Sequence, residues 1–569
     1  MNQIQTAARS AVILSLCTLA ASIPSNAQDG RFDHDRDIVF YPGNLVVSRS
    51  VYDNNPNNVK VGTVLPPNCA STTGGCSAAT GAPYNGTYPQ VFNNDIYDAN
   101  FGVTSKIFLD QITLFGWRIN SVEVPNSSQR HITSTSDQLV TSFSSKSEIA
   151  LNLSTDGRLL TFMGYVSPID AIDVSNSNTP AAIDPTDPVG LNTYRAVATV
   201  DASGHFTFTE TNAYSGNNGR ATILNNTDGA NVIYTAGNAG NGSNPQPNGI
   251  VLGAGAQFIE PATVPENSQT PTTPTPLSSF SVTLLGDKAD KVGKDDNFRG
   301  LTIFNDVVYL TKGSGSNGVN TVYFVDTTGT ACPKAVGVPA VGAKLPISPL
   351  SYDATKLQTT GLPSNMCILA GFPTALAKSA NPLAAPFGLW FANADTLYVA
   401  DEGDGYTGGT DLYTHAAGQT LAGLQKWVFN STTNTWSLAY TLTSGLGLGT
   451  SYTVPNYPTG NNPATNLPWA PATDGLRNLT GHVDRDGHAT IWAITSTISG
   501  NGDVGADPNR LVAIRDLVQN TDPTVAAKEQ FFTLRQAGFA EVLRGVSFTP
   551  GSNVAHDRHD YDHGYDHDR

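Results

Sequence analysis

The feature that most constrains the fold is a pattern of strands that recurs along the chain. Each copy has a short apolar strand, a turn and a second strand with a central aromatic residue or leucine, as in 299–304 followed by 307–312. Short alternating apolar runs bounded by Gly, Asn and Asp are typical of strands and turns. A Gly- and Asn-rich loop then leads to a third strand and often to a fourth. The copies are anchored at positions 148, 220, 299, 388 and 477, which are 72, 79, 89 and 89 residues apart.

Four-stranded units in a fixed order predict the blades of a β-propeller. The last copy of the first strand, at 543–548, is followed only by a tail. The start of the exported chain supplies three further strands, at 44–49, 106–112 and 118–124, which have no first strand of their own. A blade closed by both chain ends would remove exposed sheet edges. We therefore expect an all-β, six-bladed propeller of four-stranded blades over residues 38–550, with seven blades as the alternative.

The N-terminus has the pattern of an export signal. Arg9 is the only charge before Asp29, an apolar run covers 11–23, and small residues precede a cleavage point after Ala27. A run of this length is too short to span a bilayer. We expect a signal peptide at 1–27, an acidic, His-containing segment at 28–37, a tail at 551–569, and a secreted, monomeric product without a membrane span, periplasmic if the cell is Gram-negative.

Charge and cysteine content exclude several classes of function. The formal net charge is −16, and loss of the leader with its one arginine makes it −17, which argues against a nucleic-acid partner. Four cysteines remain in the exported chain, and an even number predicts disulfides. Pairing near neighbours gives Cys69–Cys76 and Cys332–Cys367, one of three possible arrangements. The sequence has no motif for covalent haem, a nucleotide or a GxSxG nucleophile.

Several first strands begin with an acid or amide, two further residues and an arginine. A repeat preserves the position of each residue relative to the propeller axis, so these side chains should surround one channel mouth. Arginine suits bidentate recognition of carboxylate or phosphate. The alternative is that acids and arginines pair with one another and hold the blades together. The candidate ligand-binding residues are Arg220, Arg299, Arg477, Arg544, Lys312, Asp296, Asp474 and Glu541.

Two acidic segments are candidate metal sites. The loop with Asp401, Glu402 and Asp404, running to Asp411, could bend carboxylates around Ca²⁺, and the alternative is a solvated acidic turn. The tail combines His and Asp, a mixture that binds transition metals weakly and is also typical of disordered chain. Its histidines are His556, His559, His563 and His567. Other histidines, His415 among them, show no metal-ligand spacing and are expected on the surface or in the core.

Several stretches resemble a family of secreted, largely uncharacterised bacterial and fungal propeller proteins. They include RGLTIFNDVVYLTKGSGSNGVNTVY, FGLWFANADTLYVADEGDG and GNGDVGADPNRLVAIRD. More distantly, LYVAD resembles strands of NHL-repeat and gluconolactonase-like propellers. The resemblance implies fold and export but no activity. Our first hypothesis is a binding or surface protein that holds an anionic or carbohydrate-type ligand at the channel mouth. The alternative is a calcium-assisted hydrolase of the lactonase or phosphoesterase type, for which the sequence identifies no base.

Overall fold

The computed structural model describes residues 38–52, 104–125, 138–143, 148–167, 169, 195–211, 214, 218–238, 255–262, 266–267, 277–280, 297–315, 317–332, 335–347, 366–406, 408–462, 466–500 and 504–552. The chain divides into two units, Met1–Ile38 and Val39–Arg569, and only Ile38 of the first is described. The predicted signal peptide, the 28–37 segment, Cys69, Cys76, Asp296 and the histidine tail lie outside the described residues.

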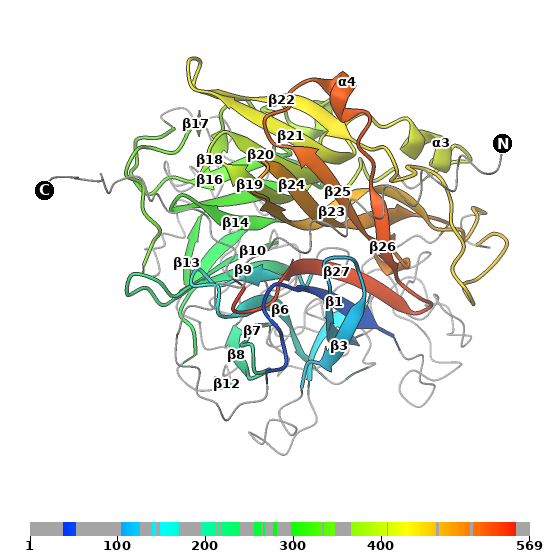
Figure 1. The fold of residues 1–569 in the computed structure, drawn as a ribbon, viewed down its shortest axis with the longest axis horizontal. Coiled ribbons are helices and arrows are strands. Elements are labelled where there is room, and N and C mark those ends of the chain that lie inside the picture. The colour runs from blue at the N-terminus through cyan, green and yellow to red at the C-terminus, as the bar shows by residue number, and fades with distance from the viewer. Residues whose placement is uncertain are drawn as a thin grey trace, which may run out of the picture. The chain divides into compact units, whose positions relative to one another are not determined.

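Four separate sheets of four or five strands follow one another along the described chain. We name each sheet by its first strand in the sequence (Figure 1). The β9 sheet has β9 (Gly219–Asn225), β10 (Val232–Gly237), β11 (Ala256–Ile259) and β13 (Leu277–Phe280), and the β14 sheet has β14 (Leu301–Phe304), β15 (Val307–Lys312), β16 (Thr321–Val325), β18 (Met366–Leu369) and β17 (Val336–Gly337). The β19 sheet has β19 (Pro386–Asn393), β20 (Thr396–Asp401), β21 (Gly423–Asn430) and β22 (Thr435–Leu442). The β23 sheet has β23 (Ala472–Val483), β24 (His488–Ile498), β25 (Arg510–Leu517) and β26 (Phe532–Gln536).

The remaining strands form one ten-stranded sheet, so the expectation of six or seven separate blades was wrong. Its main order is β12 (Glu266–Asn267), β8 (Phe206–Thr211), β7 (Arg195–Val200), β6 (Leu160–Ser167), β4 (Gln138–Ser142), β2 (Thr104–Ile112), β1 (Leu45–Val51) and β27 (Glu541–Phe548). In addition, β3 (Arg118–Glu123) pairs with β2, and β5 (Asn152–Leu153) pairs with β6. The physical reason is β4, which pairs with the ends of both β2 and β6 and fuses two groups of strands.

The two ends of the described chain meet in this ten-stranded sheet, as the sequence predicted. Strand β1 pairs antiparallel with β27, with Leu45 opposite Phe548 and Val51 opposite Glu541. Figure 1 shows the blue β1 beside the red β27. Each of these strands gains a partner for its backbone groups, which would otherwise form an open sheet edge.

The first strands of neighbouring sheets approach one another closely, and glycine makes the approach possible. A Cβ atom on Gly388 would lie 2.6 Å from the carbonyl oxygen of Arg477 in the next sheet, and one on Gly545 would lie 2.5 Å from that of Ile149. A Cβ atom on Gly300 would likewise meet the carbonyl oxygen of Phe387. Any larger residue at these positions would force the sheets apart.

Hydrogen bonds also link neighbouring sheets close to their first strands. Asn478 Nδ2 donates to the Arg544 carbonyl at 2.8 Å, and the Ala150 amide donates to the Arg220 carbonyl at 3.3 Å. The Phe298 amide donates to the Gly237 carbonyl at 3.0 Å. Each sheet is therefore joined to the next near its first strand, and the result is a propeller-like, all-β arrangement.

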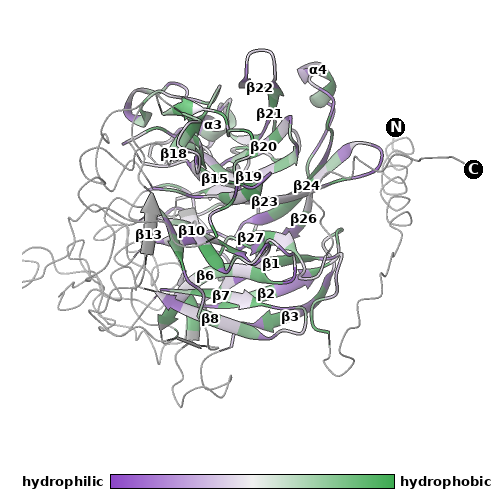
Figure 2. Cartoon of the chain, turned by 90° about the vertical axis from the view of Figure 1, so that its left-hand side faces the viewer, coloured by the Kyte–Doolittle hydropathy of each residue, from purple (hydrophilic) through white to green (hydrophobic). Residues whose placement is uncertain are grey.

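Turn chemistry and aromatic packing explain the individual sheets. Asn305 and Asp306 have φ values of 45° and 60° and form the two-residue turn between β14 and β15, a conformation that Asn and Asp tolerate well. Between the β14 and β19 sheets, the ring of Phe391 lies 4.4 Å from that of Phe304 and 4.6 Å from that of Tyr309. Apolar and polar segments mix within single strands (Figure 2), as expected when each strand has differently covered faces.

The disulfide Cys332–Cys367 is present, as the sequence predicted. It ties β18 to the loop that follows β16, and its Cα atoms are 5.9 Å apart. Disulfides persist mainly in oxidising compartments. Among the residues that the structure describes, no helix has both the length and the apolar character needed to cross a membrane.

Candidate functional site

Arg299 is a buried arginine that lies two residues before the start of β14. Only 4% of the residue is exposed. Its Nη2 donates to Ser314 Oγ, and its guanidinium carbon lies 5.7 Å from the centre of the Phe387 ring. Its Nε has no hydrogen-bond partner, and no carboxylate within the described chain forms an ion pair with it. A buried charge without such compensation is costly.

Arg299 lies near two further arginines, Arg220 on the β9 sheet and Arg477 on the β23 sheet. Burial, and then the nearby charge of Arg299, hold the pKa of Arg220 well below its usual range. Burial also lowers the pKa of Arg299, the charge of Glu402 raises it, and Arg477 lowers it. We call Arg220, Arg299 and Arg477 the arginine cluster. The equivalent repeat positions thus bring like charges together, an arrangement that disfavours the cationic forms unless an anion is close.

The other members of the arginine cluster use their donors differently. Arg220 Nη1 donates to the Phe298 carbonyl at 2.8 Å and also to Asn297 Oδ1. Arg477 Nε forms an ion pair with Glu402 Oε2 at 3.3 Å, and both side chains are buried. This pair joins the β19 and β23 sheets, which is the structural role that the alternative interpretation of the sequence expects.

Arg544 and Glu541, predicted to act together, have different partners. Arg544 Nε donates to Ser50 Oγ at 3.1 Å, and its Nη2 donates to the Phe143 carbonyl. Glu541 instead pairs with Arg49 at 2.6 Å. Both residues therefore help to hold β27 against β1 and its surroundings.

A buried glutamate links Arg544 to the arginine cluster. Burial raises the pKa of Glu148, while hydrogen bonds from Tyr165 and Thr141 and the charges of Arg195 and Arg544 lower it. The charge of Glu148 also raises the pKa of Arg220. The four arginines at the repeat position thus share one set of buried charges.

Lys312 is fully buried, and the hydrogen bonds that the structure describes for it do not go to the 401–411 loop. Its Nζ donates to Asn320 Oδ1 at 2.7 Å and to the Ser314 carbonyl at 3.0 Å. Asn320 in turn donates to the Ala384 carbonyl of the next sheet at 3.0 Å. These contacts place Lys312 in a structural link between the β14 and β19 sheets.

The acidic residues of the 401–411 loop do not converge on one point. Asp401 accepts hydrogen bonds from the amides of Ala385 and Gly403 and from Gln425 Nε2, so its oxygens face the protein. Asp411 accepts from Tyr406 at 2.8 Å. In the described part of the chain, these carboxylates supply no group of three oxygens close enough to share a metal ion. The residues present do not form a calcium site in this arrangement.

Two carboxyl groups beside this loop titrate near neutral pH. Burial raises the pKa of Asp401 to about 7, against the hydrogen bonds from the amides of Ala385 and Gly403, and Glu402 and Asp474 raise it further. Burial and then the charge of Asp404 raise the pKa of Asp474 to about 7. Asp474 Oδ1 accepts from Gln419 Nε2 at 2.5 Å. At neutral pH these groups are therefore only partly ionised, and they offset less of the positive charge nearby.

A histidine that the sequence analysis set aside forms a pair with Asp404. His415 lies on α3 (Leu412–Ala417), and its Nε2 is 2.7 Å from Asp404 Oδ2. Its ring stacks on Tyr406 with centroids 4.1 Å apart. Both partners of the pair are about one-third exposed, at 35% and 28%. The spacing of 11 residues carried no recognisable signal, because only the fold of the loop and α3 brings the two together.

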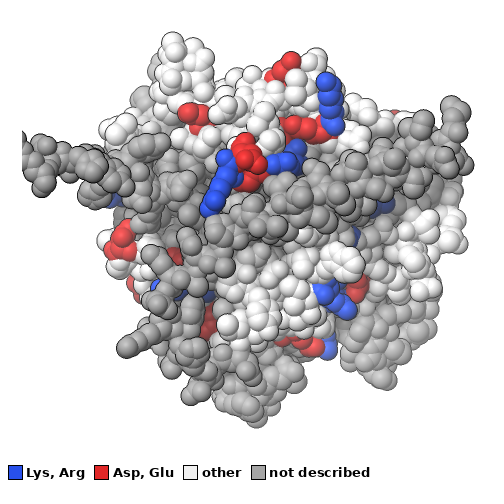
Figure 3. All heavy atoms as spheres, in the orientation of Figure 1, with Lys and Arg blue, Asp and Glu red and all other residues white. Residues whose placement is uncertain are grey.

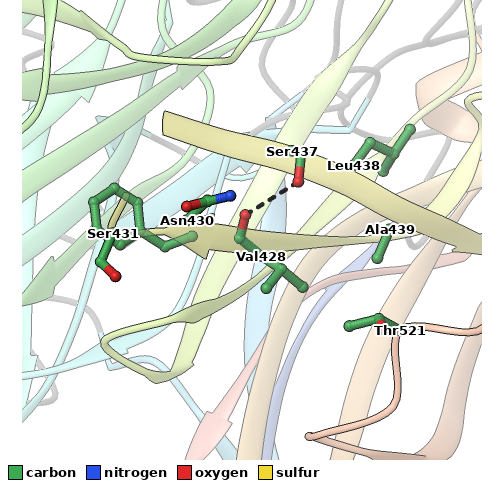
Figure 4. Close-up of a pocket in the computed structure, with 8 residues that line it drawn as sticks. Val428, Asn430, Ser431, Ser437, Leu438, Ala439 and Thr521 are labelled. Carbon is green, nitrogen blue, oxygen red and sulfur yellow. Dashed lines mark hydrogen bonds between the residues drawn. The ribbon is translucent and has the colours of Figure 1, made fainter. Parts of the chain in front are cut away.

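A hollow of ≈ 530 Å³ lies elsewhere, on the outer strands of the β19 sheet. Residues of β21 and β22 line it together with Thr521 (Figure 4). Its lining contains no titratable side chain and none of the residues predicted from the sequence. On the face shown in Figure 3, charged side chains are sparse among the described atoms and both signs occur.

Comparisons with known proteins show distant likeness of fold. No family model matches the sequence, and no curated protein matches it. A putative 6-phosphogluconolactonase from Bacteroides uniformis covers 89% of this chain and 100% of its own, with 10% identity and a TM-score of 0.30. A PL25 ulvan lyase covers 79% and 92%, with 11% identity and a TM-score of 0.27. Drosophila Semaphorin 1a, domains 1–2, covers 72% and 83%, with 10% identity and a TM-score of 0.26. Likeness at this level carries no argument about chemistry.

Proposed function

We propose that this protein binds a small anionic or acidic carbohydrate ligand at the arginine cluster. The observation that carries the proposal is Arg299, which is buried near two other arginines and whose Nε has no hydrogen-bond partner among the residues that the structure describes. A carboxylate, sulfate or phosphate on the ligand would supply both the missing acceptor and the missing negative charge. Such charge-assisted hydrogen bonds are stronger than neutral ones.

The balance of charge around the cluster supports an anion rather than a cation. Glu402 is engaged by Arg477, and burial raises the pKa values of Asp401 and Asp474 to about 7. The negative charge that these carboxyl groups place near the arginines is therefore reduced at neutral pH, although the whole chain is acidic. An anion from solution would supply the charge that they do not.

The test uses the thermal stability of the full chain with glucuronate, sulfate and phosphate as probes. We expect at least one probe to raise the Tm of the wild type and to bind by calorimetry. Arg299→Gln should abolish that binding, whereas the matched change Arg158→Gln, at a residue whose side chain is 83% exposed, should leave it intact. Binding that survives Arg299→Gln would contradict the proposed site. So would a wild type that binds none of the three anions.

A second candidate function is a hydrolase of the lactonase or phosphoesterase type. The observation in its favour is the pair of His415 and Asp404, because a carboxylate that orients a histidine is a common arrangement for a general base. We derive no step through calcium, since the carboxylates of the loop do not converge. Hydrolysis of lactone or phosphoester probes that disappears in His415→Gln and persists in a chelator would support this candidate. Absence of hydrolysis by the wild type would contradict it.

We also propose that the chain is exported, as the leader predicts. The disulfide Cys332–Cys367 supports this proposal, because such bonds are rare in reducing compartments. N-terminal sequencing of the protein from the culture medium or periplasm should find Gln28 as the first residue. An uncleaved chain retained in the cytoplasm would contradict it.

A further inference from the structure

A buried lysine and a buried aspartate from neighbouring sheets are in direct contact. Lys426 Nζ on β21 lies 2.8 Å from Asp516 Oδ2 on β25, and both side chains are 0% exposed. The two residues are 90 positions apart in the sequence. Removing two charged groups from water costs free energy, which the contact between them and their other hydrogen bonds offset.

The surrounding hydrogen bonds polarise both groups. Tyr440 donates its hydroxyl to Asp516 Oδ1 at 2.6 Å, and Tyr398 donates to Oδ2. Lys426 Nζ also donates to the carbonyls of Leu517 and Asn520, each at 2.8 Å. The nitrogen also donates to the Tyr440 hydroxyl at 2.9 Å, so Nζ is held by that hydroxyl and two backbone oxygens while it faces the carboxyl group of Asp516.

A second carboxyl group completes the cluster. Burial, and then its interaction with Asp516, raise the pKa of Glu529 to about 8. Its Oε2 is buried without a hydrogen-bond partner in the part of the chain that the structure describes. Burial also lowers the pKa of Lys426, against the effect of Asp516. An amine whose pKa is lowered, a carboxyl group that accepts from two tyrosine hydroxyls and an acid whose pKa is raised thus lie together.

We propose that Lys426 and Asp516 react in the folded protein to form an amide bond between Nζ and Cγ, with Glu529 as the proton carrier. This inference is independent of the proposed ligand site. Nothing in it requires a metal ion, an oxidant or a second protein. The reaction links the β19 and β23 sheets covalently.

The step balances in atoms and charge. Lys426 first passes a proton to Asp516, which leaves a neutral amine and a carboxylic acid. The nitrogen lone pair attacks Cγ, and the two tyrosine hydroxyls stabilise the negative charge that develops on oxygen. Glu529 donates its proton to the departing oxygen and takes one from the nitrogen. The products are one amide and one water molecule, and Glu529 ends in the form in which it began.

The fold supplies what such a condensation lacks in solution. Nζ lies 2.8 Å from Oδ2, an oxygen bonded to the reacting Cγ, so the encounter is intramolecular, and effective concentrations of well-oriented pairs reach about 10⁵–10⁸ M. The buried position excludes water, which would otherwise reverse the reaction. Tyr398 is fully buried beside the pair, and Tyr440 is nearly so.

The test is a tryptic peptide map of the wild-type, full-length protein as it is purified. Trypsin does not cut after a lysine whose nitrogen is in an amide, so the linked protein should give one branched species. That species joins residues 379–477 to 516–528 and is lighter by one water than its two chains. Recovery of the separate peptides 379–426, 427–477 and 516–528 would overturn the proposal and leave an ion pair.

Two variants separate the role of Glu529 from the existence of the bond. Glu529→Gln cannot carry the proton and should give only the separate peptides. The matched change at an exposed residue, Glu260→Gln, should give the branched species. A branched species from Glu529→Gln would refute the assigned role of Glu529. If that variant does not fold, the wild-type map alone still decides whether the bond exists.

Discussion

Replacing Asp474 by asparagine should make the stability of the protein less sensitive to a rise in pH from about 5 to about 8. Asp474 is only 5% exposed, and it lies beside Asp404 and Glu402 as well as Arg477. Asparagine keeps the size of the side chain and the oxygen that accepts from Gln419 at 2.5 Å. The change therefore removes the ability to ionise and leaves the packing in place.

The sign and size of the effect follow from the pKa of Asp474. Burial raises this pKa from 3.8 to about 7, so between these two values the folded state holds a proton that the unfolded chain has released. The free energy of unfolding therefore falls as the pH rises through this window and levels off above about pH 7. At about 1.4 kcal/mol per pH unit, the loss between pH 5 and pH 8 is on the order of 3 kcal/mol.

The assay is urea unfolding of wild type and Asp474→Asn at about pH 5 and pH 8. The stability of the variant relative to wild type should rise by about 3 kcal/mol between the two conditions. Asp484→Asn is the control: hydrogen bonds and Arg515 hold the pKa of Asp484 below its usual range, so its effect should be the same at both pH values. A relative stability of Asp474→Asn that does not change with pH would refute the reasoning.

Three further changes test the packing. Phe391→Ala should cost about 3–5 kcal/mol in urea unfolding, and Phe391→Leu clearly less; equal losses would contradict the stacked aromatic core. Gly388→Ala should cost about 1–3 kcal/mol, because its Cβ would meet a backbone oxygen at 2.6 Å, whereas Gly408→Ala has open space and should be near neutral; similar effects would count against the close approach of the sheets. Removing the Cys332–Cys367 bond, which closes 35 residues, should cost about 2–4 kcal/mol, and an unchanged Tm after reduction would disagree.

The repeat in the sequence predicted which residues occupy equivalent positions around the propeller axis. Arg299 and Arg477 occupy the same point of two units that are separated by the β19 unit, and the structure places them near each other. Gly300 and Gly545 follow arginines in the sequence, and both face neighbouring backbone. The pairing of the chain ends was also predictable, because one unit lacked its first strand. These features depend on order along the chain, which the sequence records directly.

Contacts between distant segments were not predictable in the same way. Strand β4 fuses two groups of strands only because its short run meets the ends of β2 and β6, and nothing local marks it. Asp404 and His415 meet through a loop and a short helix. Lys426 and Asp516 look like ordinary polar residues of two unrelated strands. Such pairs depend on how sheets pack, and pattern alone does not encode that packing.

The most direct test of the proposed binding site is crystallographic. Crystals soaked in selenate, an analogue of sulfate, should show an anomalous peak within hydrogen-bond distance of the Arg299 guanidinium, and the peak should be absent from Arg299→Gln crystals. A carboxylate of the protein itself bonded to Arg299 Nε, with no peak at the arginine cluster, would contradict the account.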